Sequence, residues 1–91
     1  MHELGIAARI VEAAVARASA AGAIRITDVH LEIGAESDVA PESIELYWPQ
    51  VTRATPAEGS RLDIQAADDP WACRLVAIDV TDDAVTNDDV S

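Results

Sequence analysis

Apolar residues recur at helical spacing in the first part of the chain. Between residues 4 and 21 they fall on one face of a helix, while charged residues such as Arg9 and Glu12 fall on the other. The apolar positions are Leu4, Ala7, Ala8, Val11, Ala14, Val15 and Ala18. This spacing predicts an amphipathic helix that ends before Gly22. Its many alanines favour close packing on a flat surface such as a sheet.

Three later stretches alternate apolar and polar residues, as expected of half-buried strands. They cover residues 24–33, 61–65 and 73–80. In the first strand the apolar parity changes between Ile26 and Val29, which predicts a bulge or twist near Thr27 and Asp28. In the third strand Val76, Ile78 and Val80 are expected on the inner face and Arg74 and Asp79 on the outer face.

A second helix is predicted to begin at Pro41, because proline is favoured at the first helical position. Ile44, Trp48 and Val51 mark its buried side. Pro49 lacks an N–H group and clashes with the preceding turn, so the helix should kink or finish near Trp48. Trp48 and its neighbour Tyr47 are most simply core residues.

The order of elements predicts an α/β (α+β) fold in which two helices pack on one face of a three-stranded mixed sheet, in the order α-β-α-β-β. A crossover through the second helix makes the first two strands parallel. A short turn after the second strand favours antiparallel pairing of the last two. We expect one domain over residues 1–80, followed by an acidic tail over residues 81–91 with little to bury, which should be disordered.

The composition narrows the classes of partner. The net charge of −11 would repel nucleic acid and anionic membranes. It either favours partners with a basic surface or only keeps the protein soluble. Cys73 is the only cysteine, which excludes an internal disulfide and a multi-cysteine zinc site within this chain. No signal peptide or membrane span is expected, and a cytoplasmic location fits best.

Met1, His2 and Glu3 are the candidate metal site. The terminal amine, the backbone nitrogen of His2 and its imidazole can close two chelate rings in one plane, an arrangement that suits Ni(II) or Cu(II). His2 is too large for the usual trimming of an initial methionine, so Met1 should remain. Chains that start with Met-His by chance are common, so the motif needs support from elsewhere.

Several stretches together resemble the HypA/HybF family of hydrogenase maturation factors. They occur in the family's order and spacing. The matching stretches are Met1-His2-Glu3-Leu4 with Ile6-Ala7, Val29-His30-Leu31-Glu32-Ile33-Gly34, Val39-Ala40-Pro41-Glu42-Ser43 and Ala57-Glu58-Gly59-Ser60-Arg61-Leu62. The resemblance covers roughly residues 1–65, and residues 74–80 resemble the family's last strand.

The resemblance implies a nickel metallochaperone for [NiFe] hydrogenase, and in some organisms for urease, with Ni(II) held by Met1, His2 and Glu3. It implies a maturation GTPase or the hydrogenase large subunit as partner, and we also consider a homodimer. In the family a zinc domain with two Cys-x-x-Cys pairs projects between the last two strands. Here only residues 66–72 stand there, followed by Cys73, so no structural zinc is expected. A natural paralogue and an engineered truncation would both look like this.

Other chemistry-bearing residues have simpler interpretations. We expect His30 to be a surface or edge residue and Cys73 a small strand residue, while Glu36, Asp38 and Glu42 form either an acidic rim or a solvated loop with a helix cap. No nucleophile and base pair stands out, so an enzyme is not expected. The alternative hypothesis is a metal-free scaffold or docking paralogue, and an acid-base enzyme would require an apolar pocket with convergent carboxylates.

Overall fold

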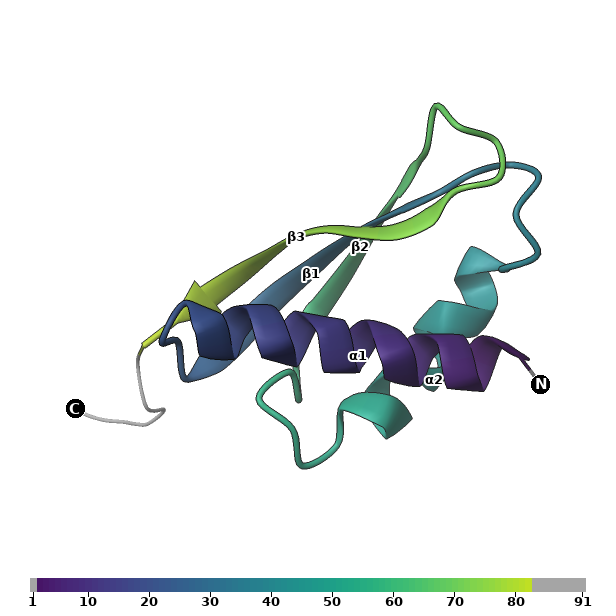
Figure 1. Ribbon diagram of the computed structural model, residues 1–91. Helices are drawn as coiled ribbons and strands as arrows, with labels where there is room; N and C mark the ends of the chain where they lie inside the picture. The colour runs from purple at the N-terminus through teal and green to yellow at the C-terminus, as the bar shows by residue number, and fades with distance from the viewer. Residues whose placement is uncertain (1, 83–91) are drawn as a thin grey trace.

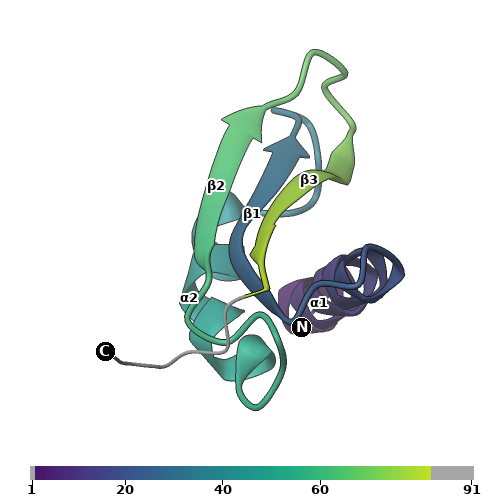
Figure 2. The ribbon, with the colours of Figure 1, turned by 90° about the vertical axis from the view of Figure 1, so that its left-hand side faces the viewer.

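The computed structural model describes residues 2–82, which form two helices and one three-stranded sheet (Figure 1). In chain order the elements are α1 (His2–Ala20), β1 (Arg25–Ile33), α2 (Pro41–Thr52), β2 (Arg61–Ala66) and β3 (Cys73–Thr81). Both helices lie on the same side of the sheet, as the second view makes plain (Figure 2). The predicted fold class and order of elements are confirmed.

β1 is the central strand, in the order β2-β1-β3. It pairs with β2 in parallel, as the crossover through α2 requires, and with β3 in antiparallel register. The predicted pairing of the last two strands is therefore wrong, because β3 pairs with β1 instead. The connection after Ala66 passes over the end of β1 at Gly34, where the amide of Gly34 donates to the carbonyl of Ala72 at 2.8 Å. This crossing places β3 on the opposite edge.

Two bulges interrupt the pairing of β1 with β3. Ile26 pairs with Val80 and Asp28 with Asp79, which leaves Thr27 as the extra residue and confirms the predicted bulge. The second bulge leaves Val76 without a partner opposite, and its side chain is 46% exposed. The expectation that Val76 faces the core is wrong, because the extra residue shifts the alternation.

The outcome for the other residues of β3 follows from this shift. Ile78 packs against the core, as predicted, and Leu75 does so in place of Val76. Val80 is 40% exposed near the end of this edge strand. Asp79 faces outward, as predicted, and lies beside His30.

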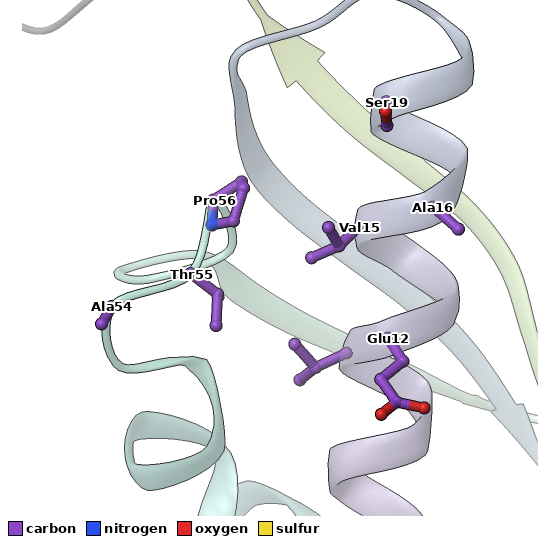
Figure 3. A pocket seen from close by; sticks show the side chains of 8 residues that line it. Glu12, Val15, Ala16, Ser19, Ala54, Thr55 and Pro56 are labelled. Atoms are coloured by element: carbon purple, nitrogen blue, oxygen red, sulfur yellow. The ribbon is translucent and has the colours of Figure 1, made fainter.

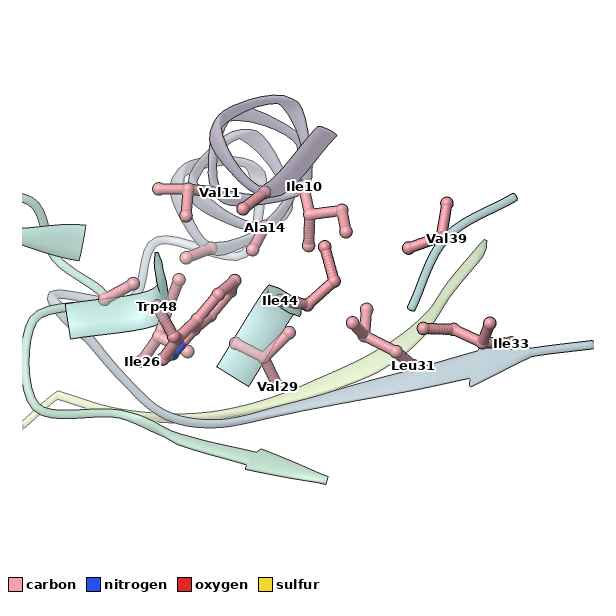
Figure 4. Close-up of a cluster of buried hydrophobic side chains, with 13 residues drawn as sticks. Ile10, Val11, Ala14, Ile26, Val29, Leu31, Ile33, Val39, Ile44 and Trp48 are labelled. Carbon is pink, nitrogen blue, oxygen red and sulfur yellow. The ribbon is translucent and has the colours of Figure 1, made fainter. Parts of the chain in front are cut away.

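The core lies between the helices and the inner face of β1 (Figure 4). Its members are small aliphatic residues with one tryptophan: Ala7, Ile10, Val11, Ala14 and Ala18 of α1, Ile26, Val29, Leu31 and Ile33 of β1, Ile44 and Trp48 of α2, and Val39 and Ala57 of the connections. Each fully buried Ile or Leu side chain stabilises the fold by roughly 1.5–3 kcal/mol through the transfer of apolar surface from water. The alanines let α1 approach closely, as its sequence predicts.

α2 continues past Pro49 to Thr52, so the interpretation that it finishes near Trp48 is wrong. The hydroxyl of Thr52 donates to the Trp48 carbonyl at 2.8 Å within this last turn. The indole of Trp48 is 4% exposed, and its Nε1 donates to Ser60 Oγ at 3.0 Å. This bond ties α2 to the start of β2 and satisfies the one polar atom of the buried side chain.

The boundaries of the described chain limit two predictions. β3 extends through Thr81, one residue beyond the expected end of the domain. Residues 83–91, which hold most of the predicted acidic tail, lie outside the described residues. Within residues 2–82, neither helix is both long and apolar enough to cross a membrane.

Candidate functional site

The proposed metal clamp lies at the start of α1. The helix begins at His2, two residues earlier than the apolar pattern predicts, and Met1 lies outside the described residues. Glu3 is half-buried in the first turn. The first four N–H groups of an α-helix have no acceptor within the helix. The backbone nitrogens of His2 and Glu3 are therefore not needed for hydrogen bonds of the helix.

The covalent geometry of a chelate allows α1 to persist when three nitrogens bind. One ring joins the amine to the His2 nitrogen through the Met1 backbone, and the other joins that nitrogen to the imidazole through Cα and Cβ of His2. Neither ring contains the ψ angle of His2, whereas the second ring includes its N–Cα bond and therefore restricts φ. A fourth bond, from the Glu3 nitrogen to the metal, would close a five-membered ring that contains the ψ angle of His2. In a helix ψ is near −42°, and the ring would pull it toward an eclipsed value.

The electrostatics at this position act in two directions. The N-terminal end of a helix carries a partial positive charge, which opposes a bound cation by roughly 0.3–1 kcal/mol. Glu3 is the acidic residue of the first turn and offsets this repulsion. Deprotonation of the coordinating backbone nitrogens would add further negative charge next to the ion.

Side chains alone do not form a second metal centre in the described part of the chain. Within residues 2–82, no three His, Cys, Asp or Glu side chains are placed together in a way that could hold an ion. The clamp draws on the amine of Met1 and on backbone nitrogens, which such a grouping of side chains does not include. Met1, His2 and Glu3 therefore remain a prediction.

A polar cluster covers the outer face of the sheet, opposite the helices. His30 of β1 lies at its centre, with Nδ1 2.9 Å from Asp63 Oδ2 of β2 and Nε2 2.8 Å from Asp79 Oδ2 of β3. An imidazole can donate from both nitrogens only when it is protonated. The hydrogen bond to Asp79, followed by that to Asp63, raises the pKa of His30 above its ordinary value. The bond from His30 in turn lowers the pKa of Asp63.

Two ion pairs flank His30 along the same face. Arg61 Nε lies 3.0 Å from Asp28 Oδ1, and Arg74 Nη2 lies 2.7 Å from Glu32 Oε1. These two ion pairs and the two contacts of His30 all join different strands, so they fix the register as well as neutralise charge. The expectation that His30 is a surface residue is confirmed. The sequence did not predict its two carboxylate partners, because they become neighbours only when the register of β2 and β3 is known.

Cys73 stands at the start of β3 and packs partly against the core. It lines a small cleft of about 220 Å³ between α1 and β3, together with Ile6, Arg9 and Leu75 among others. Burial raises the pKa of its thiol, so the thiolate that binds metals or reacts is disfavoured. This environment supports the interpretation of Cys73 as a small strand residue.

The acidic residues before α2 do not provide a side-chain cap. Ala40 is the N-cap residue and makes no capping hydrogen bond from its side chain, and Pro41 occupies the start of the helix. The expectation of a capped loop is therefore wrong in this respect. Glu36 instead uses its backbone, with its amide donating to the Pro70 carbonyl at 2.6 Å. Glu36 and Asp38 lie in a loop that contacts the β2–β3 connection.

An apolar groove of about 420 Å³ lies between α1 and the segment after α2 (Figure 3). Its lining residues are Val11, Glu12, Val15, Ala16 and Ser19 on α1 and Ala54, Thr55 and Pro56 on the opposite wall. Glu12 is the single ionisable residue of the lining. A general acid and base pair is therefore not formed here, and the groove gives no support to the acid-base enzyme that the sequence left open.

Comparison with known proteins gives one family. Residues 1–87 match the family model described as hydrogenase/urease nickel incorporation, metallochaperone, hypA. That description is of a carrier of nickel and not of an enzyme, in agreement with the expectation from the sequence.

Individual relatives agree with this match. The chain is 45% identical over 65 residues to a "Hydrogenase maturation factor HypA" of Chlorobium limicola, an alignment that covers 71% of this chain and 56% of the relative. It is 40% identical over 65 residues to the protein of the same name from Roseiflexus sp., and this alignment covers 71% of this chain and 53% of the relative. It is 39% identical over 74 residues to the protein of the same name from Geotalea uraniireducens, and this alignment covers 81% of this chain and 64% of the relative. The chain thus spans between half and two thirds of the length of these curated relatives.

Proposed function

Because the chain belongs to the HypA family of nickel-incorporation metallochaperones, we propose that it binds one Ni(II) ion through Met1, His2 and Glu3 and delivers it for hydrogenase maturation. The observation that carries this proposal is the start of α1 at His2. It supports the proposal because the backbone nitrogens of His2 and Glu3 lie in the part of a helix where N–H groups lack helical acceptors. Either nitrogen can lose its proton to a metal without the loss of a hydrogen bond of the helix.

Planar nitrogen donors make the affinity dependent on pH. The imidazole and the amine must be unprotonated, and their ordinary pKa values are about 6.5 and about 8. Affinity should therefore rise as pH increases through this range. Cu(II) should bind at least as tightly as Ni(II), since copper stands above nickel in the general order of stability. Selection of nickel then depends on supply and on the acceptor protein.

The proposed acceptor is a maturation GTPase or the hydrogenase large subunit, with urease maturation as a related use. The net charge of −11 favours a partner with a basic surface and disfavours nucleic acid. We place the protein in the cytoplasm and consider a homodimer as an additional state. None of these partners is required for the ion to bind at the N-terminus.

We also propose that the unit described here acts without structural zinc. Its one cysteine, Cys73, cannot form a four-cysteine site on its own. The connection between β2 and β3 is closed by local bonds, with Ala67 N donating to the Ile33 carbonyl at 3.2 Å and Ala72 N to the Asp69 carbonyl at 3.1 Å. These bonds support the proposal, because they close the connection without an inserted metal-binding module.

The test is a calorimetric titration of Ni(II) into the untagged protein at pH 7.5. We expect one tight site, loss of at least about 100-fold in affinity for His2→Ala, and a similar loss when the terminal amine is acetylated, since each change removes one of the nitrogen donors. His30→Gln and Cys73→Ala are matched controls that remove the other imidazole and the thiol, and they should leave the affinity within about threefold. Equal binding by the acetylated protein would contradict the clamp, and absence of tight binding by the native protein would favour the metal-free docking paralogue.

A further inference from the structure

Trp71 is exposed in the β2–β3 connection, two residues before β3 begins. Its side chain is 71% accessible, whereas the other tryptophan, Trp48, is 4% accessible and belongs to the core. The β2–β3 connection projects from the end of the sheet, beside the start of the loop that leads from β1 to α2 (Figures 1 and 2). The proposed function does not use this part of the molecule.

The backbone on either side of Trp71 is held in place. The amide of Trp71 donates to Asp69 Oδ1 at 3.0 Å, and the amide of Glu36 donates to the Pro70 carbonyl at 2.6 Å. Gly34 lies directly under Asp69 and Pro70, where a β-carbon would overlap their backbone atoms. The tryptophan is thus presented on a fixed turn. Less conformational entropy is lost when such a group is bound than when a flexible loop is bound.

The two loops around Trp71 carry charge of one sign. Residues 34–40 and 66–72 contain four acidic residues and no lysine or arginine. The four are Glu36, Asp38, Asp68 and Asp69. The nearest basic residue in sequence, Arg74, is paired with Glu32 at 2.7 Å. An apolar side chain within an acidic rim is complementary to an apolar pocket surrounded by lysine and arginine.

We propose that Trp71 anchors the docking of a partner protein that offers an apolar pocket with a basic rim. Tryptophan is among the residues that most often dominate binding energy at interfaces, especially when they fill a pocket and water is excluded around them. The acidic rim would speed the encounter with a basic partner. The same charge repels a second copy of this chain, nucleic acid and anionic lipid, so these are not the proposed occupants.

The choice of the partner tested rests on the proposed function. The proteins to use are the maturation GTPase and the hydrogenase large subunit from the same organism, each titrated with the full chain in a calorimeter. Trp71→Ala should raise Kd by about 30-fold, the equivalent of the roughly 2 kcal/mol that defines a strong interface anchor. Asp68→Lys should slow association and weaken its dependence on salt. Leu46→Ala is the matched control, since Leu46 is 73% exposed on α2, and it should change Kd by less than about threefold.

Each result bears on the proposal separately from the clamp. An unchanged Kd for Trp71→Ala, or binding of neither protein by the native chain, would overturn the docking site. In a Trp48→Phe variant, Trp71 is the remaining tryptophan, so a shift of tryptophan emission with neutral phosphatidylcholine vesicles alone would identify a membrane contact instead and also overturn the docking site. Ni(II) affinity should be unchanged in Trp71→Ala, so that failure of nickel binding and failure of docking are told apart.

Discussion

Gly34 packs against the backbone of Asp69 so closely that a β-carbon at position 34 would overlap the Asp69 carbonyl oxygen. This contact lies where the β2–β3 connection crosses the end of the central strand. It explains how a short connection can carry the chain from one edge of the sheet to the other. It also fixes the turn that presents Trp71.

Gly34→Ala is predicted to destabilise the fold by about 1–3 kcal/mol, because backbone atoms and not a flexible side chain must move to admit the methyl group. The measurement is the midpoint of urea unfolding. Gly5→Ala is the matched control, since no atom lies within 4 Å of a β-carbon there, and alanine in a helix should stabilise by up to about 1 kcal/mol. Equal stability of the Gly34→Ala variant and the native protein would contradict the crowding.

His30→Gln is predicted to reduce stability in a way that depends on pH. The pKa of His30 is raised in the folded state, mainly by its bond to Asp79, so its contribution is fully present below its unfolded pKa of about 6.5 and is lost as pH rises through the folded value. The pKa of Asp63 is lowered by His30, so that contribution is lost as pH falls through the lowered value. The difference between native and variant protein should therefore be largest between about pH 4 and 6.5.

Unfolding midpoints in urea at pH 5.5 and 8.5 measure this difference. Glu45→Gln, which changes an exposed carboxylate on α2, serves as the control for general effects of pH. A His30→Gln difference that is the same at both values, or larger at pH 8.5, would show that the imidazole is not held as a cation between the carboxylates.

Ser60→Ala is predicted to destabilise the protein by about 1–3 kcal/mol, because the buried Nε1–H of Trp48 loses its acceptor. Trp48 fluorescence in a Trp71→Phe background reports the local change, and urea unfolding reports the stability. Ser19→Ala, on the exposed face of α1, should change stability by less than about 0.5 kcal/mol. A similar small change for Ser60→Ala would mean that water replaces the hydroxyl.

Local patterns predicted much of this fold. The change of parity between Ile26 and Val29 correctly indicated the bulge at Thr27, because that bulge is visible in a single strand. The bulge at Val76 was missed, since Val76, Ile78 and Val80 alternate regularly and only the pairing with β1 reveals the extra residue. Bulges of this second kind depend on the partner strand and leave no trace in the local sequence.

Contacts between distant segments were the other limit. The His30, Asp63 and Asp79 cluster required the register of three strands, and sequence spacing does not supply it. The strand predicted over residues 24–33 correctly ends before Gly34, but the contact of Gly34 with Asp69 depends on the path of the connection. The donor set of the N-terminal clamp could be predicted from the sequence alone, because its donors are adjacent in the chain and need no fold to bring them together.

The most direct measurement of the central claim is the NMR spectrum of the protein loaded with one equivalent of Ni(II). Nickel in a square-planar nitrogen site is diamagnetic, so resonances should stay sharp and the changes should be confined to residues 1–7, the proposed ligands and the first turns of α1. Nickel held by carboxylates and water in octahedral geometry is paramagnetic. Broadened or strongly shifted resonances centred on His30, Asp63 and Asp79, with the start of α1 unaffected, would contradict the N-terminal clamp.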